Sequence, residues 1–592
     1  MAIKGAIKVE SSQEAQLIEF IKRYYSNEKL EAHLEADKIQ SILAQFTAIK
    51  EYAQETFTEH SLLTDEEMII LTLSIFSPHP SPEKAIVAKE RSYMEVKRAL
   101  SRFYCVEQLQ RDEAGFAEFV ACQQQDKKYI PGLNKEEYLE ISKKFQAKDR
   151  LTIDTLKLAT LISSVPLSAE AKKRADKIFG KGNYVVDSVE FPAKVFEDIN
   201  LARQIYPQVD VFLNHLETEA QRQRVTKLLK SAFLHHCHYR HMLYTEGSKN
   251  MFTTFIKEVK AGRLDKEGYD FWVLYWTTNI AGFQGQVEPK GAYYLTLYTY
   301  KTMRALESVL ESVFEDETVT EKDLLSAYLN KRASMLDLGN VQAMRLSLNL
   351  AEQLFLAHIG AMMRMYHPEQ GQLLSAAYMM EKSVVDPLRR EFFSPDESMP
   401  TPTYAPALFA NAKDRIIERY EQEKVFLSTK RINVKSVNLT AQELKEMLAT
   451  FEALILCLPL YLKALQEYKR LRREKLISAD IPLSFQTIAN QKWVEELFDK
   501  SIILDKVNIL ELIDITVSES GAVTYNKKPN YDDLLRAQQQ REEADLFIDP
   551  KAPKPVLMSG FTSKPAVGAS KLGEVSVVVQ QPSDQQDRKV YK

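Results

Sequence analysis

The order of apolar and polar residues along the chain repeats with the period of an amphipathic α-helix. After Ser11 to Glu14, apolar residues return at helical spacing: Leu17, Ile18, Ile21 and Tyr25. Such spacing gathers apolar side chains on one face of a helix. Helix starts are also recognisable, because a hydroxyl residue followed three positions later by an acid satisfies the free amides of a helix N-terminus. Thr320 to Asp323 and Thr440 to Glu443 have this pattern, which predicts a largely helical protein.

Two apolar stretches indicate buried helices. Residues Arg345 to Met365 are apolar on nearly every face, and a helix of this kind is buried, so we predict that it is central to the largest domain. The most apolar run, Ala453 to Leu462, has ten residues and contains Pro459. A membrane span needs about twenty apolar residues, so we expect no transmembrane segment. The helix that begins near Thr440 is expected to run toward Pro459, where the run is broken because proline lacks a backbone donor.

A short segment near the C-terminal end has the pattern of two strands. Leu512 to Val517 and Ala522 to Tyr525 flank Ser518 to Gly521, which has the composition of a turn. We therefore predict an all-α fold, a mostly helical assembly of helix bundles, with one small β-hairpin at residues 512–525.

Changes in composition divide the chain into four predicted regions. Residues 123–134 and the proline-rich residues 394–406 have the character of connectors. These breaks give an N-terminal helical region at 1–125, a central helical domain at 135–393 and a C-terminal helical region with the hairpin at 407–530. Residues 531–592 lose helical periodicity, and their C-terminal part is rich in proline and basic residues. We expect a disordered tail there.

Composition supports the helical prediction and narrows the class of partner. Glycine accounts for 18 of 592 residues, about 3%, less than half of the usual share of roughly 7%. Glycine serves tight turns, so its scarcity favours long helices over many short strands. The net charge of −4 and the isoelectric point near 6.3 give no global electrostatic case for nucleic-acid binding, so we expect a partner other than nucleic acid.

Cysteine usage and the N-terminus bear on the cellular compartment. The four cysteines are scattered without a CxxC pair: Cys105, Cys122, Cys237 and Cys457. A secreted protein held by disulfides needs dense, paired cysteines, so we expect a reducing, cytoplasmic environment. Residues 1–8 contain no apolar stretch long enough for a secretory signal.

A histidine-rich segment is the first candidate for chemistry. Five of the ten histidines lie between His215 and His241. On a helix, Cys237, His238 and His241 share one face and present three ligands suited to zinc or iron. The segment lacks an HExxH pattern, and a fourth ligand must come from elsewhere. The alternative is a helix whose histidines are hydrogen-bonded or solvated.

An aromatic segment followed by glycines is the second candidate. Trp272 and Trp276 precede Gly282 and Gly285 in a chain that uses glycine rarely. Glycine permits unusual backbone geometry or a close approach by a ligand, a peptide or another helix. We consider two interpretations: a ligand pocket beneath the two tryptophans, and a structural turn between helices with aromatic packing. The segment has neither the phosphate-loop nor the dinucleotide motif.

A basic run is the third candidate. Lys469, Arg470, Arg472 and Arg473 follow the apolar segment that ends near Leu465. A basic helix of this kind binds an anionic membrane surface or an acidic protein partner. The alternative is a solvated helix face without a partner.

The end of the chain carries the one resemblance to known proteins. Arg541-Glu542-Glu543 is followed by a Ser-, Gln- and Lys-containing tail to Lys592. This composition resembles the C-terminal export signals of large helical effector proteins that intracellular bacteria export by type IV secretion. The resemblance covers about the last fifty residues. It implies export into a host cytosol without a cleaved N-terminal signal, and it implies no particular activity.

No motif assigns a reaction to this chain. The nucleophile elbow GxSxG, the kinase motifs and the papain-like cysteine context are all missing from the sequence. The favoured hypothesis is a helical interaction or scaffold protein, an exported effector that binds a host protein or a membrane surface. The alternatives are a metal-dependent helical enzyme, with zinc or iron, and a binder of apolar ligands centred on residues 235–300.

Overall fold

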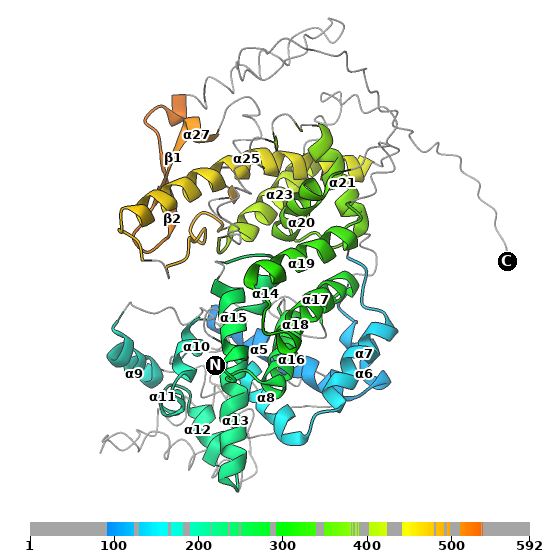
Figure 1. Cartoon of the computed structure of the whole chain (residues 1–592), viewed down its shortest axis with the longest axis vertical. Coiled ribbons are helices and arrows are strands. Elements are labelled where there is room, and N and C mark those ends of the chain that lie inside the picture. Colours follow the sequence, from blue (N-terminus) through cyan, green and yellow to red (C-terminus); the bar gives the residue numbers. More distant parts are fainter. Residues whose placement is uncertain are drawn as a thin grey trace, which may run out of the picture. The chain divides into compact units, whose positions relative to one another are not determined.

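A computed structural model gives the architecture of the chain. It describes the following residues: 91–123, 130–163, 167, 169–181, 190–214, 216–234, 237–247, 250–283, 292–338, 348–380, 382, 385–386, 389, 402–422, 441–478, 481–490, 494–495, 497, 509–533 and 536. They contain twenty helices and one two-stranded sheet (Figure 1). The predicted all-α fold with a single small hairpin is therefore confirmed.

The chain divides into two compact units. Unit 1 comprises residues 1–240 and 254–318, and unit 2 comprises residues 241–253 and 319–592. The division falls inside α14 (Tyr239–Leu243) and α15 (Asn250–Lys260). The segments predicted to separate the domains, at 123–134 and 394–406, are only partly described, and the predicted domain boundaries stay a prediction.

Unit 1 consists of helices throughout its described part. Besides its parts of α14 and α15, it contains α5 (Arg91–Gln110), α6 (Glu113–Phe119), α7 (Lys135–Gln146), α8 (Arg150–Ile162), α9 (Ala169–Phe179), α10 (Glu190–Phe196), α11 (Ile199–Ile205), α12 (Pro207–Asn214), α13 (Glu219–Ala232), α16 (Lys266–Ala281), α17 (Leu297–Leu310) and α18 (Ser312–Glu315).

Helix α16 lies at the centre of unit 1. Every residue from Gly268 to Ala281 is buried except Asp270, because this stretch is apolar or aromatic on all faces. It packs against α5, α8 and α13. Aromatic rings fill the space around it, with the Trp272 ring centroid 5.2 Å from that of Tyr239 and 5.7 Å from that of Phe255. The core of unit 1 is therefore built on this one helix.

Unit 2 combines helices with the hairpin. Its elements are α19 (Glu321–Met335), α20 (Leu350–Met362), α21 (Pro368–Met380), α23 (Ala405–Gln422), α25 (Ala441–Arg473), α27 (Ile509–Leu512), β1 (Ile513–Val517) and β2 (Val523–Lys527). Helix α20 begins later than the predicted Arg345, and residues 341–347 lie outside the described residues. Its segment from Phe355 to Met362 is buried on all faces, as the sequence predicts for this stretch.

Helix α25 differs from its prediction at Pro459. The apolar run is broken there in the sequence, yet the helix, 33 residues long in total, runs through Pro459 to Arg473. Proline removes the amide that would bond to the carbonyl of Ile455. The neighbouring Leu458 and Leu460 are fully buried, and α25 packs against α21, α23 and β1. This tertiary burial outweighs the local cost of the proline.

Helix caps explain several of the helix starts. At α19, the Thr320 side chain accepts a hydrogen bond from the Asp323 amide, and the Asp323 carboxylate accepts one from the Thr320 amide. This is the reciprocal cap that the sequence predicts, and it satisfies two amides that the helix leaves free. The start predicted for α25 at Thr440 lies outside the described residues, although α25 begins at the next position.

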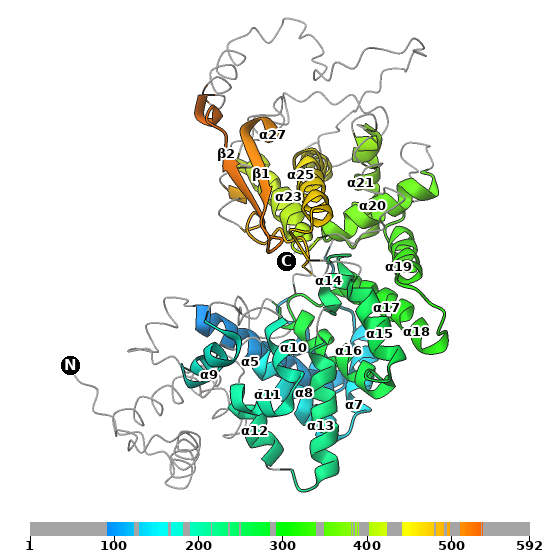
Figure 2. The same cartoon turned by 60° about the vertical axis from the view of Figure 1, so that its left-hand side comes forward.

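The predicted hairpin is confirmed. Strands β1 and β2 pair antiparallel, with Ile513 opposite Lys527 and Val517 opposite Val523. Gly521 closes the turn at a φ of 77°, a conformation that glycine adopts without strain. In Figure 2 the two strands lie beside the long helix α25, with which β1 is in contact.

None of the described helices combines the length and the apolarity that crossing a bilayer requires. The predicted tail at 531–592 is described only at residues 531–533 and 536, and the N-terminal region before residue 91 is not described. The predicted helices at residues 1–90 and the predicted disorder of the tail therefore stay predictions.

Candidate functional site

The histidine-rich segment lies between two helices. Helix α13 ends at Ala232 and α14 begins at Tyr239, so Cys237 and His238 precede the helix that contains His241. Cys237 and His238 are buried in unit 1, and the His238 ring centroid lies 4.2 Å from that of Trp276. His241 belongs to unit 2, with its Nε2 atom 4.0 Å from the Glu246 carboxylate.

The described residues contain no group of three or more His, Cys, Asp or Glu side chains that could hold a metal ion. His235 and His236 lie outside them. The set of Cys237, His238 and His241 stays a prediction, which elemental analysis of the purified chain for zinc and iron tests directly.

The aromatic segment forms the core of unit 1. Trp272 and Trp276 are exposed by 0% and 2%, so neither ring is accessible from solvent. Both indole N–H groups are buried without a hydrogen-bond partner within the described part of the chain. The observed packing is the one expected of a structural helix. The ligand pocket beneath the two rings stays a prediction, with the two unsatisfied indole donors as its remaining support.

Gly282 permits a close approach between two helices. It caps the C-terminal end of α16 at a φ of −84°, which any residue can adopt. A Cβ atom at this position would lie 2.5 Å from Cγ and 2.8 Å from the backbone nitrogen of Arg102, in α5. Of the alternatives left open by the sequence, contact with another helix is thus the observed one at Gly282. Gly285 lies outside the described residues.

The basic run forms the end of α25. We call residues Lys469 to Leu476 the basic end. Leu471 and the preceding Tyr468 are buried, whereas Arg472, Arg473 and Lys475 are exposed. Arg470 differs from its neighbours because Glu467 and Glu474 both accept hydrogen bonds from it, with the Glu474 contact at 2.6 Å. Its charge is therefore largely neutralised within the helix.

The chain leaves α25 in a defined conformation. The Leu476 amide donates to the Leu471 carbonyl at 2.9 Å, and the Lys475 amide donates to the Arg472 carbonyl at 3.1 Å. This pair of bonds is the Schellman motif, in which one residue adopts the left-handed region, usually glycine. Here Lys475 holds that position at a φ of 60°. Leu476 follows it and is 52% exposed, one of the few large apolar side chains that the described residues expose.

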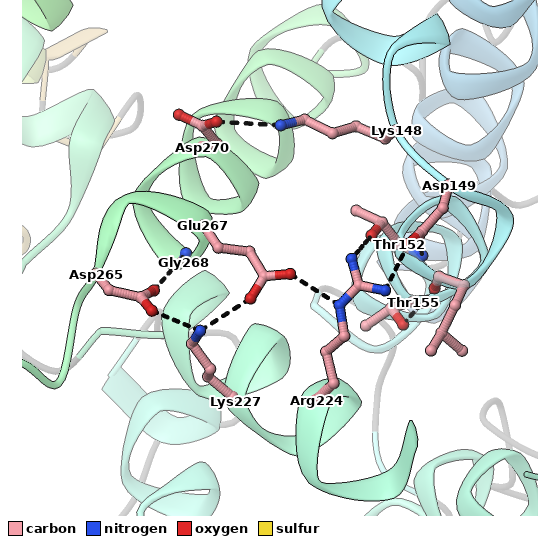
Figure 3. Close-up of polar contacts among 11 residues, drawn as sticks. Lys148, Asp149, Thr152, Thr155, Arg224, Lys227, Asp265, Glu267, Gly268 and Asp270 are labelled. Atoms are coloured by element: carbon pink, nitrogen blue, oxygen red, sulfur yellow. Dashed lines mark hydrogen bonds and ion pairs between the residues drawn. The ribbon is translucent and has the colours of Figure 1, made fainter. Parts of the chain in front are cut away.

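A further polar site, which the sequence did not indicate, lies on α13 in unit 1 (Figure 3). Arg224 donates to Asp149 at 2.5 Å and to Glu267 at 2.8 Å, and Lys227 donates to Asp265 at 2.6 Å and to Glu267 at 2.9 Å. We call these five residues the α13 ion cluster. Asp149 and Asp265 are the N-caps of α8 and α16, so the cluster joins two helix starts to the middle of α13.

The ion cluster keeps its acids charged. Desolvation acts to raise the pKa of Asp149, but hydrogen bonds from Thr152 and Arg224 outweigh it and lower the pKa to about 2. Hydrogen bonds from Lys227 and Arg224 lower the pKa of Glu267. Carboxylates at helix N-termini are further stabilised by the helix dipole. The cluster has the properties of a structural clamp between three helices.

Unit 1 also contains a pocket of about 930 Å³ beside this cluster. One wall is a polar stripe on α13 whose residues recur every three or four positions: Glu219, Arg222, Gln223, Thr226, Lys227 and Lys230. The opposite side consists of residues from α10, α11 and α12. Lys227 belongs to both the stripe and the ion cluster.

No known protein family, curated protein or solved structure matches this chain.

Sequence reasoning did not identify the α13 pocket or its ion cluster. The signal that was available is the charged stripe of α13, since its residues share one face by their spacing alone. Its partners are distant in sequence: Asp149 lies 75 positions from Arg224, and Asp265 lies 38 positions from Lys227. No local pattern relates such residues, so only the fold brings them together.

Proposed function

We propose that this chain is a helical interaction protein that binds an anionic lipid surface through the basic end of α25. The observation that carries the proposal is the exposure of Leu476 directly beside Arg472, Arg473 and Lys475. Exposed cations around an exposed apolar side chain are the two components of peripheral membrane binding. An acidic protein partner is the alternative that the experiment below also addresses.

The charges set the strength of the interaction. Each Lys or Arg near an anionic membrane contributes about 1 kcal/mol, so the three exposed cations contribute roughly 3 kcal/mol. Partial burial of Leu476 adds on the order of 1 kcal/mol. A total of about 4 kcal/mol corresponds to a dissociation constant near 1 mM in accessible lipid. The proposed binding is therefore weak, reversible and sensitive to salt.

Lys475 ends its helix as Asp337 and Arg364 end α19 and α20, each at a positive φ, and it offers a test of whether the basic run serves lipid binding or the fold. A non-glycine residue in the left-handed region costs roughly 1–2 kcal/mol, and glycine is the usual residue of this motif. Cations at a helix C-terminus also interact favourably with the helix dipole, which is the competing explanation for the whole run. Lys475→Gly separates the two explanations. It should stabilise unit 2 by about 1 kcal/mol while weakening vesicle binding about fivefold through the lost charge.

Vesicle co-sedimentation of the full chain tests the proposal. The chain should sediment with phosphatidylserine-containing phosphatidylcholine vesicles and remain in solution with phosphatidylcholine alone. Arg472→Gln/Arg473→Gln should weaken binding about 30-fold, as two lost charges predict. The matched control is Lys322→Gln/Lys331→Gln, which removes two exposed lysines of α19 in the same unit and should leave binding unchanged.

Two results would contradict the membrane proposal. Equal losses in both double variants would mean that overall charge, and not the basic end, controls binding. No sedimentation at any phosphatidylserine content would remove the membrane as partner and leave an acidic protein surface as the remaining candidate.

Export into a host cytosol is a separate part of the proposal, supported by the composition of the tail. Residues 541–592 lie outside the described residues. A reporter fused to residues 541–592 should be transferred by a type IV secretion system into host cells, and the same reporter fused to residues 1–540 should not. Transfer of the second fusion alone would contradict this part without affecting the vesicle result.

A further inference from the structure

Helix α9 is a peripheral element of unit 1. Figure 1 and Figure 2 both show it at the outside of this unit, beside α10 and α11, and it packs against α11. Arg174 donates to the Gln204 carbonyl at 2.8 Å, and Ala175 is fully buried. This contact determines which face of α9 points inward and which faces solvent.

The solvent face of α9 carries lysines. Lys173 and Lys177 are one helical turn apart, so they share a face, and both are exposed. The helix ends at Phe179, Gly180 follows at a φ of 83°, and the exposed Lys181 comes next. Within the described residues, none of these three ammonium groups has a hydrogen bond or an ion pair.

An apolar side chain is exposed among these cations. Ile178 is 44% exposed and directly follows Lys177. The next residue, Phe179, packs edge-on against the ring of Phe191, with centroids 5.6 Å apart, so the end of α9 is anchored on α10 without Ile178. We call Lys173, Lys177, Ile178 and Lys181 the α9 face. It combines free cations with an exposed aliphatic group, as the basic end of α25 does.

The acids of α9 do not cancel its positive charge. Residues 169–181 contain five cations and two acids: Lys172, Lys173, Arg174, Lys177 and Lys181 against Glu170 and Asp176. Helix α10 adds Lys194, Glu190 and Glu197, so an excess of positive charge remains over the two helices together. Lys194 is exposed, and its ammonium group lies 5.4 Å from the centroid of the Phe179 ring, at the same end of α9.

The helix dipole explains part of this charge pattern. It favours an acid in the first turn of a helix and a cation in the last, where Glu170 and Lys177 lie. It does not account for Lys173 in the middle of the helix, nor for the exposure of Ile178. These two features therefore point to a partner outside the chain.

The chemistry of the α9 face fits a lipid bilayer better than a protein surface. Its free cations are lysines, which are point charges on flexible stems, whereas a specific carboxylate or phosphate site favours the bidentate arginine. Arg174, the arginine of this helix, is bound to the backbone of α11 instead. Lysines around one aliphatic side chain supply the two components of peripheral membrane binding, attraction to headgroups and insertion of an apolar group.

We propose that α9 is a second lipid contact, through which unit 1 binds an anionic bilayer. Lys173, Lys177 and Lys181 attract acidic headgroups, and Ile178 enters the boundary between headgroups and acyl chains. This inference rests on the proposed function for its partner, the anionic lipid, but not for its site, since α9 belongs to unit 1 and the basic end of α25 to unit 2. Because one chain carries both contacts, binding at one raises the effective concentration of the other at the same bilayer.

Lipid quenching at position 178 tests the contact in the full chain. A fluorophore is attached at Ile178→Cys, with the half-buried Cys122 replaced by serine. Vesicles that contain phosphatidylserine and a quencher near the headgroup should quench it, and phosphatidylcholine vesicles with the same quencher should not. A fluorophore at Lys143→Cys, an exposed position of α7 in the same unit, should remain bright.

Charge removal provides the second measurement. Lys173→Gln/Lys177→Gln should weaken co-sedimentation with phosphatidylserine-containing vesicles about 30-fold, as two lost charges predict. The matched control is Lys143→Gln/Lys230→Gln, which removes two exposed lysines from α7 and α13 of the same unit and should bind like the wild type.

The results at α9 and at α25 are distinguishable. Quenching at Leu476→Cys without quenching at Ile178→Cys, or wild-type binding of Lys173→Gln/Lys177→Gln, overturns the α9 contact and leaves the proposed function intact. Quenching at Ile178→Cys alone supports the α9 contact and contradicts binding through the basic end. Binding of a glutamate-rich peptide that Lys173→Gln/Lys177→Gln abolishes, without quenching at position 178 by any vesicle, would also overturn the contact and assign the α9 face to an acidic protein.

Discussion

Gly282→Ala tests whether this glycine serves the packing of α16 against α5 or a ligand. The new methyl group would lie 2.5 Å from Cγ, 2.8 Å from the backbone nitrogen and 3.1 Å from Cα of Arg102. Ordinary contacts to a Cβ atom are 3.4 Å or longer. Because two of the three atoms belong to the backbone of α5, a change of side-chain rotamer does not relieve the overlap.

The expected magnitude follows from two opposing terms. Overpacking of a core costs about 1–3 kcal/mol, and here the upper part of that range applies because helix backbone must move. Replacing glycine by alanine restricts the unfolded chain and returns roughly 0.4–1 kcal/mol, since the φ of −84° suits alanine. We therefore expect Gly282→Ala to lower the free energy of unfolding of unit 1 by about 1.5–2 kcal/mol.

Gly262→Ala is the matched control in the same unit. Its Cβ would have no atom within 4 Å, but its φ is 68°. Only backbone strain opposes this substitution, so the net loss should be smaller, about 0.5–1 kcal/mol. The two glycines thus separate overlap with a neighbouring helix from backbone strain.

Urea unfolding followed by tryptophan fluorescence provides the measurement. The chain has three tryptophans, and a Trp493→Phe background leaves only Trp272 and Trp276, both in the core of unit 1 beside Gly282. Unfolding of Gly282→Ala at the wild-type midpoint would refute the packing argument. It would return Gly282 to the set of candidate ligand-contacting residues.

Two further predictions use titration and capping. Asp149→Ala should destabilise unit 1 by about 1–1.5 kcal/mol, because it removes both the α8 cap and the half-exposed pair with Arg224, whereas Asp149→Asn keeps the cap and should cost at most about 0.5 kcal/mol. The pKa of Asp149 is about 2, below its ordinary value of 3.8, so the charged carboxylate contributes fully to the stability of unit 1 above pH 3.8 and loses this contribution as the pH falls through 2. The difference in free energy of unfolding between wild type and Asp149→Asn, measured by urea, should therefore vanish as the pH falls through 2. A difference that grows on acidification would contradict this prediction. Burial lowers the pKa of His358 from 6.5 to about 3, so unit 2 should lose up to ~1.4 kcal/mol per pH unit as the pH falls from 6.5 toward 3, and His358→Leu should remove this slope from the pH dependence of its urea midpoint. An unchanged slope in His358→Leu would show that other groups cause the acid sensitivity.

Local patterns predicted the features that local interactions decide. The reciprocal cap at Thr320 and Asp323 and the hairpin around Gly521 involve residues a few positions apart, so the sequence shows both partners at once. The glycines at 282 and 285 indicated either unusual backbone geometry or a close approach, but which of the two applies at Gly282, and that the approaching element is α5 at Arg102, depends on the fold. The sequence therefore indicated the constraint and not its cause.

The incorrect expectation at Pro459 and the missed pocket have one reason in common. At Pro459 the burial of Leu458 and Leu460 outweighs the local preference to end the helix. The pocket combines α13 with α10, α11 and α12 on the opposite side, and its paired and unpaired lysines differ only through acids at distant helix starts. Tertiary contacts decide both, and a single sequence does not record them.

Lipid quenching of a fluorophore at position 476 tests the proposed function most directly. The fluorophore is attached at Leu476→Cys, with the half-buried Cys122 replaced by serine and the other three cysteines buried. Vesicles that contain phosphatidylserine and a quencher near the headgroup should quench this fluorophore, and a fluorophore at Lys331→Cys should remain bright. Equal quenching at the two positions, or none at position 476 under conditions where the chain sediments with vesicles, would contradict binding through the basic end of α25.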